Sequence, residues 1–204
     1  MLTSEELAIK QHFMTVEEVI YLRYLTLLLD KNPIIVNIGA GAGTSALAMW
    51  EGRPDAMIYT IDIYDMGYPE GCLEHERKSL QEAELWGNTE IRTSFYNKSI
   101  IAITSKETHD RYKHFQIHGN SRDVGKIWID YPVDMVMVDG DHSYESCKGD
   151  IEAWLPRFKK EGHRIIAFHD YGHTSFPGVQ KAVIETLPMV RSIGVMNTLV
   201  GYWL

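Results

Sequence analysis

The sequence predicts an α/β fold, doubly wound around a mostly parallel sheet. Two observations indicate it: short apolar runs rich in β-branched residues alternate with segments of helical periodicity, and a glycine-rich turn follows the first run. A third, two C-terminal apolar runs joined without a helix, predicts an antiparallel C-terminal edge strand. The 204 residues, 45% hydrophobic and 24% charged, suffice for one domain with a full core. We expect a single domain over 1–204, with an N-terminal helical cap (1–32) and an α/β core (33–204).

Charge and cysteine content limit the function classes. The net charge of −8 disfavours a protein that grips nucleic acid, which needs clustered Lys and Arg. Two cysteines without a CxxC pair argue against a disulfide framework and for a reducing cytoplasm. The most apolar window, Val19–Leu29, contains Arg23 and is too short to span a bilayer, and the N-terminus lacks a secretory-signal pattern. We expect a cytoplasmic protein with a small-molecule substrate and no nucleic acid or membrane partner; a homo-oligomer stays open.

The elements of the N-terminal half follow from a capping motif and from apolar runs. Thr15 and Glu18 form a capping box, which predicts a helix over about 16–29. Ile34–Gly39 is a short β-branched run after Pro33 and is expected to be a buried strand. The further expected strands are Met57–Asp62 and His114–Gly119, the further helices are 44–51, about 71–86 and Ser121–Trp128, and the stretch 88–112 is polar and irregular.

The C-terminal half continues the alternation. Val133–Gly140 and Arg164–Asp170 are expected strands, and Pro177 suits the first turn of a helix that ends near Leu187. Apolar residues spaced three and four apart predict a helix between the two strands, with one face against the sheet. These residues are Tyr144, Cys147, Ile151, Trp154 and Phe158. The two closing strands are expected within 189–197 and 198–204.

The glycine turn after the first strand is the first candidate ligand site. Gly39, Gly41 and Gly43 can take positive φ and let the backbone approach a ligand, and the next helix offers unpaired N–H groups. The spacing is G-x-G-x-G, with Thr44 where a dinucleotide fingerprint has its third glycine. Asp62, 19 residues after Gly43, ends the second strand and is placed to accept hydrogen bonds from ribose hydroxyls. The pattern indicates a nucleoside, either NAD or an adenosyl ligand; the plain alternative is a tight turn without ligand.

Polar side chains gather at the ends of two later strands. Asp139, Asp141 and His142 follow the fourth strand, and His169 and Asp170 end the fifth. Because these ends neighbour each other in such a sheet, their oxygen and imidazole groups are expected to converge, where they could bind a divalent cation or act as a general base. The alternative is structural: the same residues could cap the next helix and hold a turn.

The motifs resemble a known family. VNIGAGAGTSALAM (Val36–Met49) resembles the first motif of class I S-adenosylmethionine-dependent methyltransferases. DMVMVDGDHSYESCKGDIEAWLPRF (Asp134–Phe158), followed by IIAFHDY and PGVQKAV, is similar to small O-methyltransferases whose relatives include macrocin O-methyltransferase and the cephalosporin hydroxylase-like proteins. The match covers about Ile34–Ile184, with D-G-D-H-S-Y and H-D-Y as its most specific blocks.

The resemblance implies a fold and a cofactor site. The fold is a Rossmann-like methyltransferase fold with a seven-stranded sheet whose last strand is antiparallel. The cofactor is S-adenosylmethionine, with the three glycines around its methionine part and Asp62 on its ribose. Ser121, in HGNSRD (His118–Asp123), would flank the adenine, and Asp139 would lie near the sulfonium and the acceptor. Asn37 and Thr44, on either side of the glycines, are counted with the cofactor-binding residues.

The resemblance also implies a metal site, with a departure. In metal-dependent relatives, carboxylates after the fourth and fifth strands hold Mg²⁺, which points to Asp139 or Asp141 with His169 and Asp170. His169 stands where those relatives have an acidic residue or its amide, and histidine is a poorer ligand for Mg²⁺ than for Mn²⁺, Fe²⁺ or Zn²⁺. A second departure is Asn37, where many members carry an acid. A divalent cation, Mg²⁺ or Mn²⁺, is therefore an open expectation.

The leading hypothesis is methyl transfer from S-adenosylmethionine to a hydroxyl on a sugar, phenol or natural product. Asp139, His142 and His169 are the candidate catalytic residues, the histidines as bases if no metal is used. The N-terminal helices and the aromatic residues of 64–112 are the candidate cover of the acceptor: Tyr64, Tyr68, Trp86 and Tyr96. The alternatives are an NAD-dependent oxidoreductase, a metal-dependent hydrolase or oxygenase with a 2-His-1-carboxylate site, and a non-catalytic cofactor-binding module.

Overall fold

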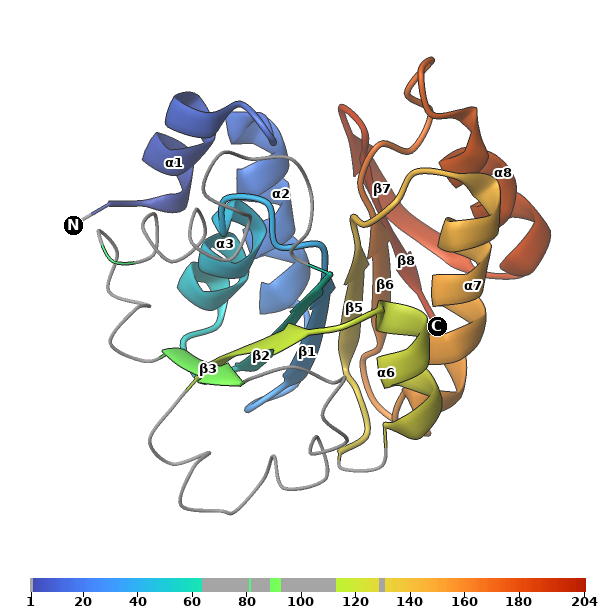
Figure 1. Cartoon of the computed structure of the whole chain (residues 1–204), viewed down its shortest axis with the longest axis horizontal. Helices are drawn as coiled ribbons and strands as arrows, with labels where there is room; N and C mark the ends of the chain where they lie inside the picture. The colour runs from blue at the N-terminus through green and yellow to red at the C-terminus, as the bar shows by residue number, and fades with distance from the viewer. Residues whose placement is uncertain (1, 64–80, 82–88, 93–112, 129–130) are drawn as a thin grey trace.

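The protein forms an eight-stranded sheet with helices on both faces, as shown by a computed structural model (Figure 1). The structure describes residues 2–63, 81, 89–92, 113–128 and 131–204. The helices are α1 (Ser4–Gln11), α2 (Val16–Leu27), α3 (Thr44–Gly52), α6 (Ser121–Ile127), α7 (Tyr144–Trp154) and α8 (Pro177–Thr186). The strands are β1 (Ile34–Ile38), β2 (Met57–Asp62), β3 (Thr89–Arg92), β4 (His114–His118), β5 (Met135–Val138), β6 (Ile165–Phe168), β7 (Arg191–Met196) and β8 (Leu199–Trp203).

The sheet order is β3-β4-β2-β1-β5-β6-β8-β7. The first six strands in this order are parallel, and β8 runs antiparallel to both β6 and β7. After β1 the chain passes to β2 on one side, and it returns later to β5 on the other, so the strand order reverses beside β1. Ligands of open α/β sheets bind beyond the carboxyl ends of the strands at such a switch point.

Both faces of the sheet are buried, which explains the continuous apolar runs of its strands. On β1, Val36 packs into one core cluster and Ile35 into the other, because successive side chains point to opposite faces. Helices α1, α2 and α3 cover the face of Ile35, and α6, α7 and α8 cover the face of Val36 (Figure 1). The expected N-terminal helices thus form part of one helical layer of the sheet.

The expected fold class is confirmed, and all seven expected strands are present. Strand β3 is an addition: it pairs with β4 at the sheet edge, within the stretch expected to be irregular, and its sequence TEIR has no apolar run to announce it. The C-terminal strand β8 is antiparallel as expected, but it lies between β6 and β7, so β7 forms the edge. The expected helix over 71–86 and most of 88–112 lie outside the described residues, apart from residues 81 and 89–92.

Two local details differ from the sequence expectation or extend it. Helix α7 ends at Trp154 and continues as a 3₁₀ turn over Leu155–Arg157, since Pro156 has no backbone N–H to donate. Phe158, expected on the helix face, therefore follows the turn, where it forms an isolated parallel bridge with Val133.

Among the described residues, no helix is long and apolar enough to cross a bilayer.

Candidate functional site

A cavity of about 580 Å³ opens at the carboxyl ends of β1, β2 and β5, at the switch point of the sheet. Residues from all parts of the predicted site line it, together with His12 and Phe13 from the segment between α1 and α2. The predicted residues that line it are Gly39, Gly41, Asp62, Ser121, Asp139, Asp141, His142, His169 and Asp170. The cavity thus joins the glycine turn to the polar cluster in one space.

The glycine turn owes its shape to positive φ angles and to one close approach of the backbone. Gly39 has φ +94°, and a Cβ there would collide with the backbone carbonyl oxygen of Asp139, so only glycine lets the backbone after β1 pass this close to the backbone after β5. Gly41 has φ +48°, and a Cβ there would meet no atom within 4 Å, because the position faces open space. Gly43, with φ +85°, is the N-cap of α3. The turn therefore presents bare backbone to the cavity.

Three of the predicted cofactor-binding residues shape the turn and do not line the cavity. Asn37 is fully buried, and its Nδ2 donates to the carbonyl oxygen of Gly39 at 3.1 Å and to Thr60 Oγ1 at 3.3 Å. Thr44 is buried in the first turn of α3, and Gly43 caps that helix. Asn37, Gly43 and Thr44 thus support the turn, and direct contact of these residues with the cofactor stays a prediction.

Asp62 and Ser121 lie on the part of the cavity expected to receive a nucleoside. Asp62 Oδ2 accepts a hydrogen bond of 2.7 Å from the N–H of Ala40, so the carboxylate also braces the glycine turn. Ser121 begins α6 and donates its hydroxyl to Asp150. Asp150 lines the same wall, is 3% exposed, and burial raises the pKa of its carboxyl to about 6.

Sequence reasoning missed Asp150, although a signal was present. Asp150 occupies a position three residues after Cys147 and one before Ile151, on the apolar stripe that turns α7 toward the sheet. A carboxylate on a buried stripe is uncommon unless it has a partner or a ligand. Its partner, Ser121, comes from another helix and is far away in the chain.

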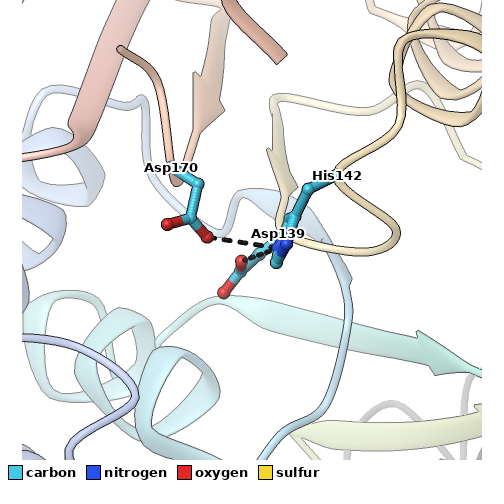
Figure 2. Close-up of side chains that lie close together, drawn as sticks. All are labelled: Asp139, His142 and Asp170. Carbon is cyan, nitrogen blue, oxygen red and sulfur yellow. Dashed lines mark ion pairs between the residues drawn. The ribbon is translucent and has the colours of Figure 1, made fainter. Parts of the chain in front are cut away.

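Asp139, His142 and Asp170 form a group that could hold a metal ion (Figure 2). One ligand atom from each lies within 4.8 Å of the others. His142 Nε2 is 3.1 Å from Asp170 Oδ2 and 3.7 Å from Asp139 Oδ1. Asp170 is held in the left-handed region with φ +56°, an uncommon conformation for a residue other than glycine. This group combines the two strand ends, as the sequence predicts.

Two of the predicted metal ligands are not in this group. The Asp141 carboxylate accepts hydrogen bonds from the Ser143 N–H at 3.1 Å, from Ser143 Oγ at 3.0 Å and from Ser146 Oγ at 2.7 Å, at the start of α7. Asp141 is therefore tied to the helix N-terminus, and these bonds lower the pKa of its carboxyl. His142 takes the place in the group that the sequence reasoning assigned to Asp141 or His169.

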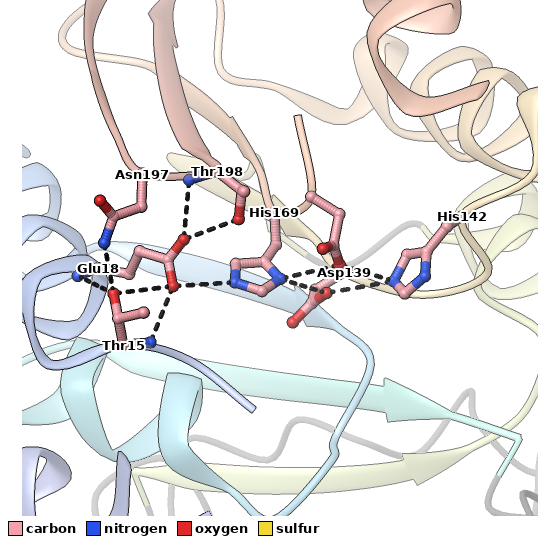
Figure 3. A network of polar contacts seen from close by, with 8 residues as sticks. Thr15, Glu18, Asp139, His142, His169, Asn197 and Thr198 are labelled. Carbon is pink, nitrogen blue, oxygen red and sulfur yellow. Dashed lines mark hydrogen bonds and ion pairs between the residues drawn. The ribbon is translucent and has the colours of Figure 1, made fainter. Parts of the chain in front are cut away.

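His169 lies behind the group of Asp139, His142 and Asp170, between this group and Glu18 of helix α2 (Figure 3). Its Nδ1 is 3.1 Å from Asp170 Oδ2 and 3.3 Å from Asp139 Oδ1. Its Nε2 faces Glu18 Oε2 at 3.3 Å. Burial by itself lowers the pKa of His169, but the three carboxylates outweigh burial and raise it. Both ring nitrogens therefore face carboxylates, and the side chain is only 8% exposed.

Glu18 is a second residue of the site that the sequence did not reveal, because the sequence predicts for it only a role in a helix cap. The capping box with Thr15 is confirmed, with Glu18 Oε2 accepting from the Thr15 N–H at 2.9 Å. The same carboxylate is buried and meets His169, so it belongs to the site as well. Burial by itself raises the pKa of Glu18, but its hydrogen bonds with His169, Thr15 and Thr198 outweigh burial and lower the pKa to about 2.

An aromatic wall continues the site beyond His142. The ring of Phe176 lies 4.3 Å from the ring of His142 and 5.1 Å from that of His173, measured between centroids. A smaller hollow of about 370 Å³ adjoins here and shares Asp141 and His142 with the main cavity. The aromatic residues expected to cover the acceptor (Tyr64, Tyr68, Trp86 and Tyr96) lie outside the described residues.

The fold and the cavity define a class of protein: a doubly wound domain with a glycine-rich turn and a cavity at the end of its first strand. The model of a family described as a methyltransferase domain matches residues 36–171, from β1 to just after β6. The chain belongs to this family and is an S-adenosylmethionine-dependent methyltransferase, which confirms the resemblance seen in the sequence.

Solved structures with the same fold support this placement. The apo structure of CalS11, a TDP-rhamnose 3′-O-methyltransferase of calicheamicin biosynthesis, has 15% identity and a TM-score of 0.62, and covers 97% of this chain and 83% of that one. SMU.1697c of Streptococcus mutans, solved in complex with S-adenosylhomocysteine, has 15% identity, a TM-score of 0.55 and coverages of 90% and 94%. An rRNA methylase of Streptococcus thermophilus has 15% identity, a TM-score of 0.53 and coverages of 90% and 93%. A search of curated protein sequences finds no match.

Proposed function

We propose that this methyltransferase transfers the methyl group to a hydroxyl of a small molecule, at a site completed by a divalent cation. The observation that carries the proposal is the single cavity that joins the bare glycine turn to the group of Asp139, His142 and Asp170. The resemblance to small O-methyltransferases and the fold shared with a sugar O-methyltransferase support a hydroxyl acceptor. Because the same fold also occurs in an rRNA methylase, the choice of a hydroxyl acceptor is argued from the residues of the site.

The residues fit the adenosyl cofactor. Gly41 leaves open space where the methionine part would lie, and Asp62 lines the cavity at the position expected for the ribose. Ser121 and Asp150 add a hydroxyl and a carboxyl on the wall expected for the adenine. The cavity volume of about 580 Å³ is that of a typical cofactor site.

The donor set fits a divalent cation. Two carboxylates and one imidazole suit Mn²⁺ or Fe²⁺ better than Mg²⁺, which prefers oxygen ligands alone. Asp139, His142 and Asp170 would hold the ion, and this set has one histidine and two acids, unlike the 2-His-1-carboxylate set of the alternative oxygenase hypothesis. A cation there would lower the pKa of a bound hydroxyl.

The chain's own residues align the reactants. Methyl transfer is an in-line displacement, in which the acceptor oxygen attacks the methyl carbon while the sulfur leaves as a neutral thioether. The glycine turn and Asp62 orient the cofactor, and the group at the ends of β5 and β6 orients the hydroxyl. If the protein works without a cation, His142 Nε2 is the base that accepts the hydroxyl proton. Its pKa is raised chiefly by Asp139, so metal-free transfer would increase as the pH rises through a value above 6.5.

The acceptor is proposed to be a neutral polyol or phenol, in the cytoplasm. Around Asp139, His142 and Asp170, the described lining residues include carboxylates, histidines, hydroxyls and Phe176. Arg122 is a cation that lines the main cavity, near Ser121. A site with several carboxylates repels an anionic acceptor, and a chain of net charge −8 is poorly suited to RNA. RNA methylation is nevertheless the competing outcome that the acceptor screen must include.

The first test is calorimetric titration of the EDTA-treated protein with S-adenosylhomocysteine, with NAD⁺ and with Mn²⁺. We expect micromolar binding of the adenosyl ligand, none of NAD⁺, and a heat of Mn²⁺ binding that disappears in Asp139→Asn/Asp170→Asn. A screen with radiolabelled S-adenosylmethionine against sugars, phenols and rRNA then identifies the acceptor. Label transfer that is undiminished in the double variant would refute the assigned acceptor site, and absence of adenosyl binding would refute the cofactor assignment.

A further inference from the structure

Glu18 accepts more hydrogen bonds than a helix cap requires. Besides the two from Thr15, its Oε1 accepts from the Thr198 N–H at 2.9 Å and from Thr198 Oγ1 at 2.7 Å, and its Oε2 faces His169 Nε2 (Figure 3). The carboxylate is 2% exposed. It thus connects three elements that are distant in the chain: α2, the turn between β7 and β8, and the end of β6.

The ring of His169 passes this connection on to the metal-binding group. Its Nδ1 lies beside Asp139 Oδ1 and Asp170 Oδ2, and these two oxygens also face His142 Nε2. The two carboxylates are therefore held between two imidazoles. Glu18 fixes the direction of the His169 ring. If this ring turned toward a metal, the buried carboxylate of Glu18 would lose its cationic partner.

We infer that Glu18 is a positioning residue: through His169 it holds Asp139 and Asp170 opposite His142, and it keeps His169 out of the ligand set. The inference rests on the proposed cation site. Residues that orient metal ligands from behind are as consequential as the ligands, and their loss typically weakens metal binding 10–100-fold.

The simpler interpretation is that Glu18 does no more than cap α2, and the chain contains a matched control for it. Glu6 of α1 forms the same capping box with Thr3, with Glu6 Oε2 accepting from the Thr3 N–H at 2.8 Å. Among the described residues, Glu6 does not line the cavity, and its carboxylate is bonded to Thr3 of its own helix end. Because a glutamine can still accept the hydrogen bond of a capping box, Glu6→Gln removes only the charge of a capping side chain. Glu18→Gln removes the same charge and also alters the contacts with His169 and Thr198.

The experiment measures Mn²⁺ and S-adenosylhomocysteine binding by calorimetry for the EDTA-treated wild type, Glu18→Gln and Glu6→Gln. We expect Glu18→Gln to bind Mn²⁺ at least about tenfold more weakly and S-adenosylhomocysteine with unchanged affinity. Glu6→Gln should match the wild type for both ligands. Unchanged or tighter Mn²⁺ binding by folded Glu18→Gln would overturn the inference.

Two further measurements separate the possible failures. If the wild type binds no Mn²⁺, the cation proposal fails, and imidazole ¹⁵N–¹H spectra decide the positioning role: signals of both His142 and His169 must move in Glu18→Gln and not in Glu6→Gln. If Glu18→Gln does not fold, Thr198→Val removes one donor and leaves the capping box intact. That variant should weaken Mn²⁺ binding by about threefold or more, and wild-type affinity in it would contradict the inference.

Discussion

Helices α1 and α2 begin with the same capping box, and the two boxes have different surroundings. In each, a threonine hydroxyl accepts from the N–H of the glutamate at 3.2 Å, and the glutamate accepts from the threonine N–H. Glu6 is exposed to solvent, whereas Glu18 is buried between the β7–β8 turn and His169. The comparison teaches that a local motif determines where a helix begins, while the tertiary fold decides whether its carboxylate has a further role.

The largest effect on stability is expected when the imidazole of His169, which lies between three carboxylates, is removed. His169→Asn leaves Glu18, Asp139 and Asp170 close together with no imidazole beside Glu18, and we expect a loss of about 3–5 kcal/mol in the free energy of unfolding. Glu18→Gln/His169→Asn removes the unpaired carboxylate too and should recover part of that loss. Urea denaturation measures both, and a double variant no more stable than the single one would show that the two residues are independent.

A smaller effect on stability is expected when the pH is lowered. The pKa of Glu18 is lowered from 4.5 to about 2, so its ionised form is favoured by folding. Its contribution to stability is fully present above pH 4.5 and is lost as the pH falls through 2, amounting to at most about 3 kcal/mol. Urea midpoints of the wild type should therefore decrease more steeply from pH 4.5 to 2 than those of Glu18→Gln.

The corresponding exposed residue is the control for acid dependence. The Thr3 hydrogen bonds lower the pKa of Glu6 as well, but solvent screens this carboxylate, so the pH dependence of Glu6→Gln should follow that of the wild type. If the urea midpoints of Glu18→Gln and Glu6→Gln changed equally with pH, the two capping boxes would not differ in their contribution to acid stability.

The smallest effect is expected from the caps themselves. Thr15→Ala should cost about 1–2 kcal/mol in the free energy of unfolding, because Thr15 Oγ1 caps α2 and also accepts from Asn197 Nδ2 at 2.8 Å. Thr3→Ala removes a cap alone at an exposed helix end and should cost less than about 1 kcal/mol. Thermal unfolding resolves the order, and a larger effect for Thr3→Ala would contradict it.

Much of the fold was predictable because the signals are local. The apolar run of β1, the glycines after it and the Thr15–Glu18 box each depend on neighbours within a few residues, and each appears as expected. Strand β3 was not predictable, since TEIR carries no apolar run and its pairing with β4 is a long-range contact. The position of β8 inside the sheet likewise depends on how the β7–β8 hairpin folds back onto β6.

The sequence by itself determined the fold class, the bare glycine turn and the presence of polar side chains at two adjacent strand ends. Only the tertiary structure decided which of them meet: His142 joins Asp139 and Asp170, Asp141 binds its own helix, and His169 turns to a glutamate 151 residues earlier. The physical reason is that spacing along the chain specifies the end of a strand, whereas the direction of a side chain depends on the charges and hydrogen-bond partners that packing brings beside it.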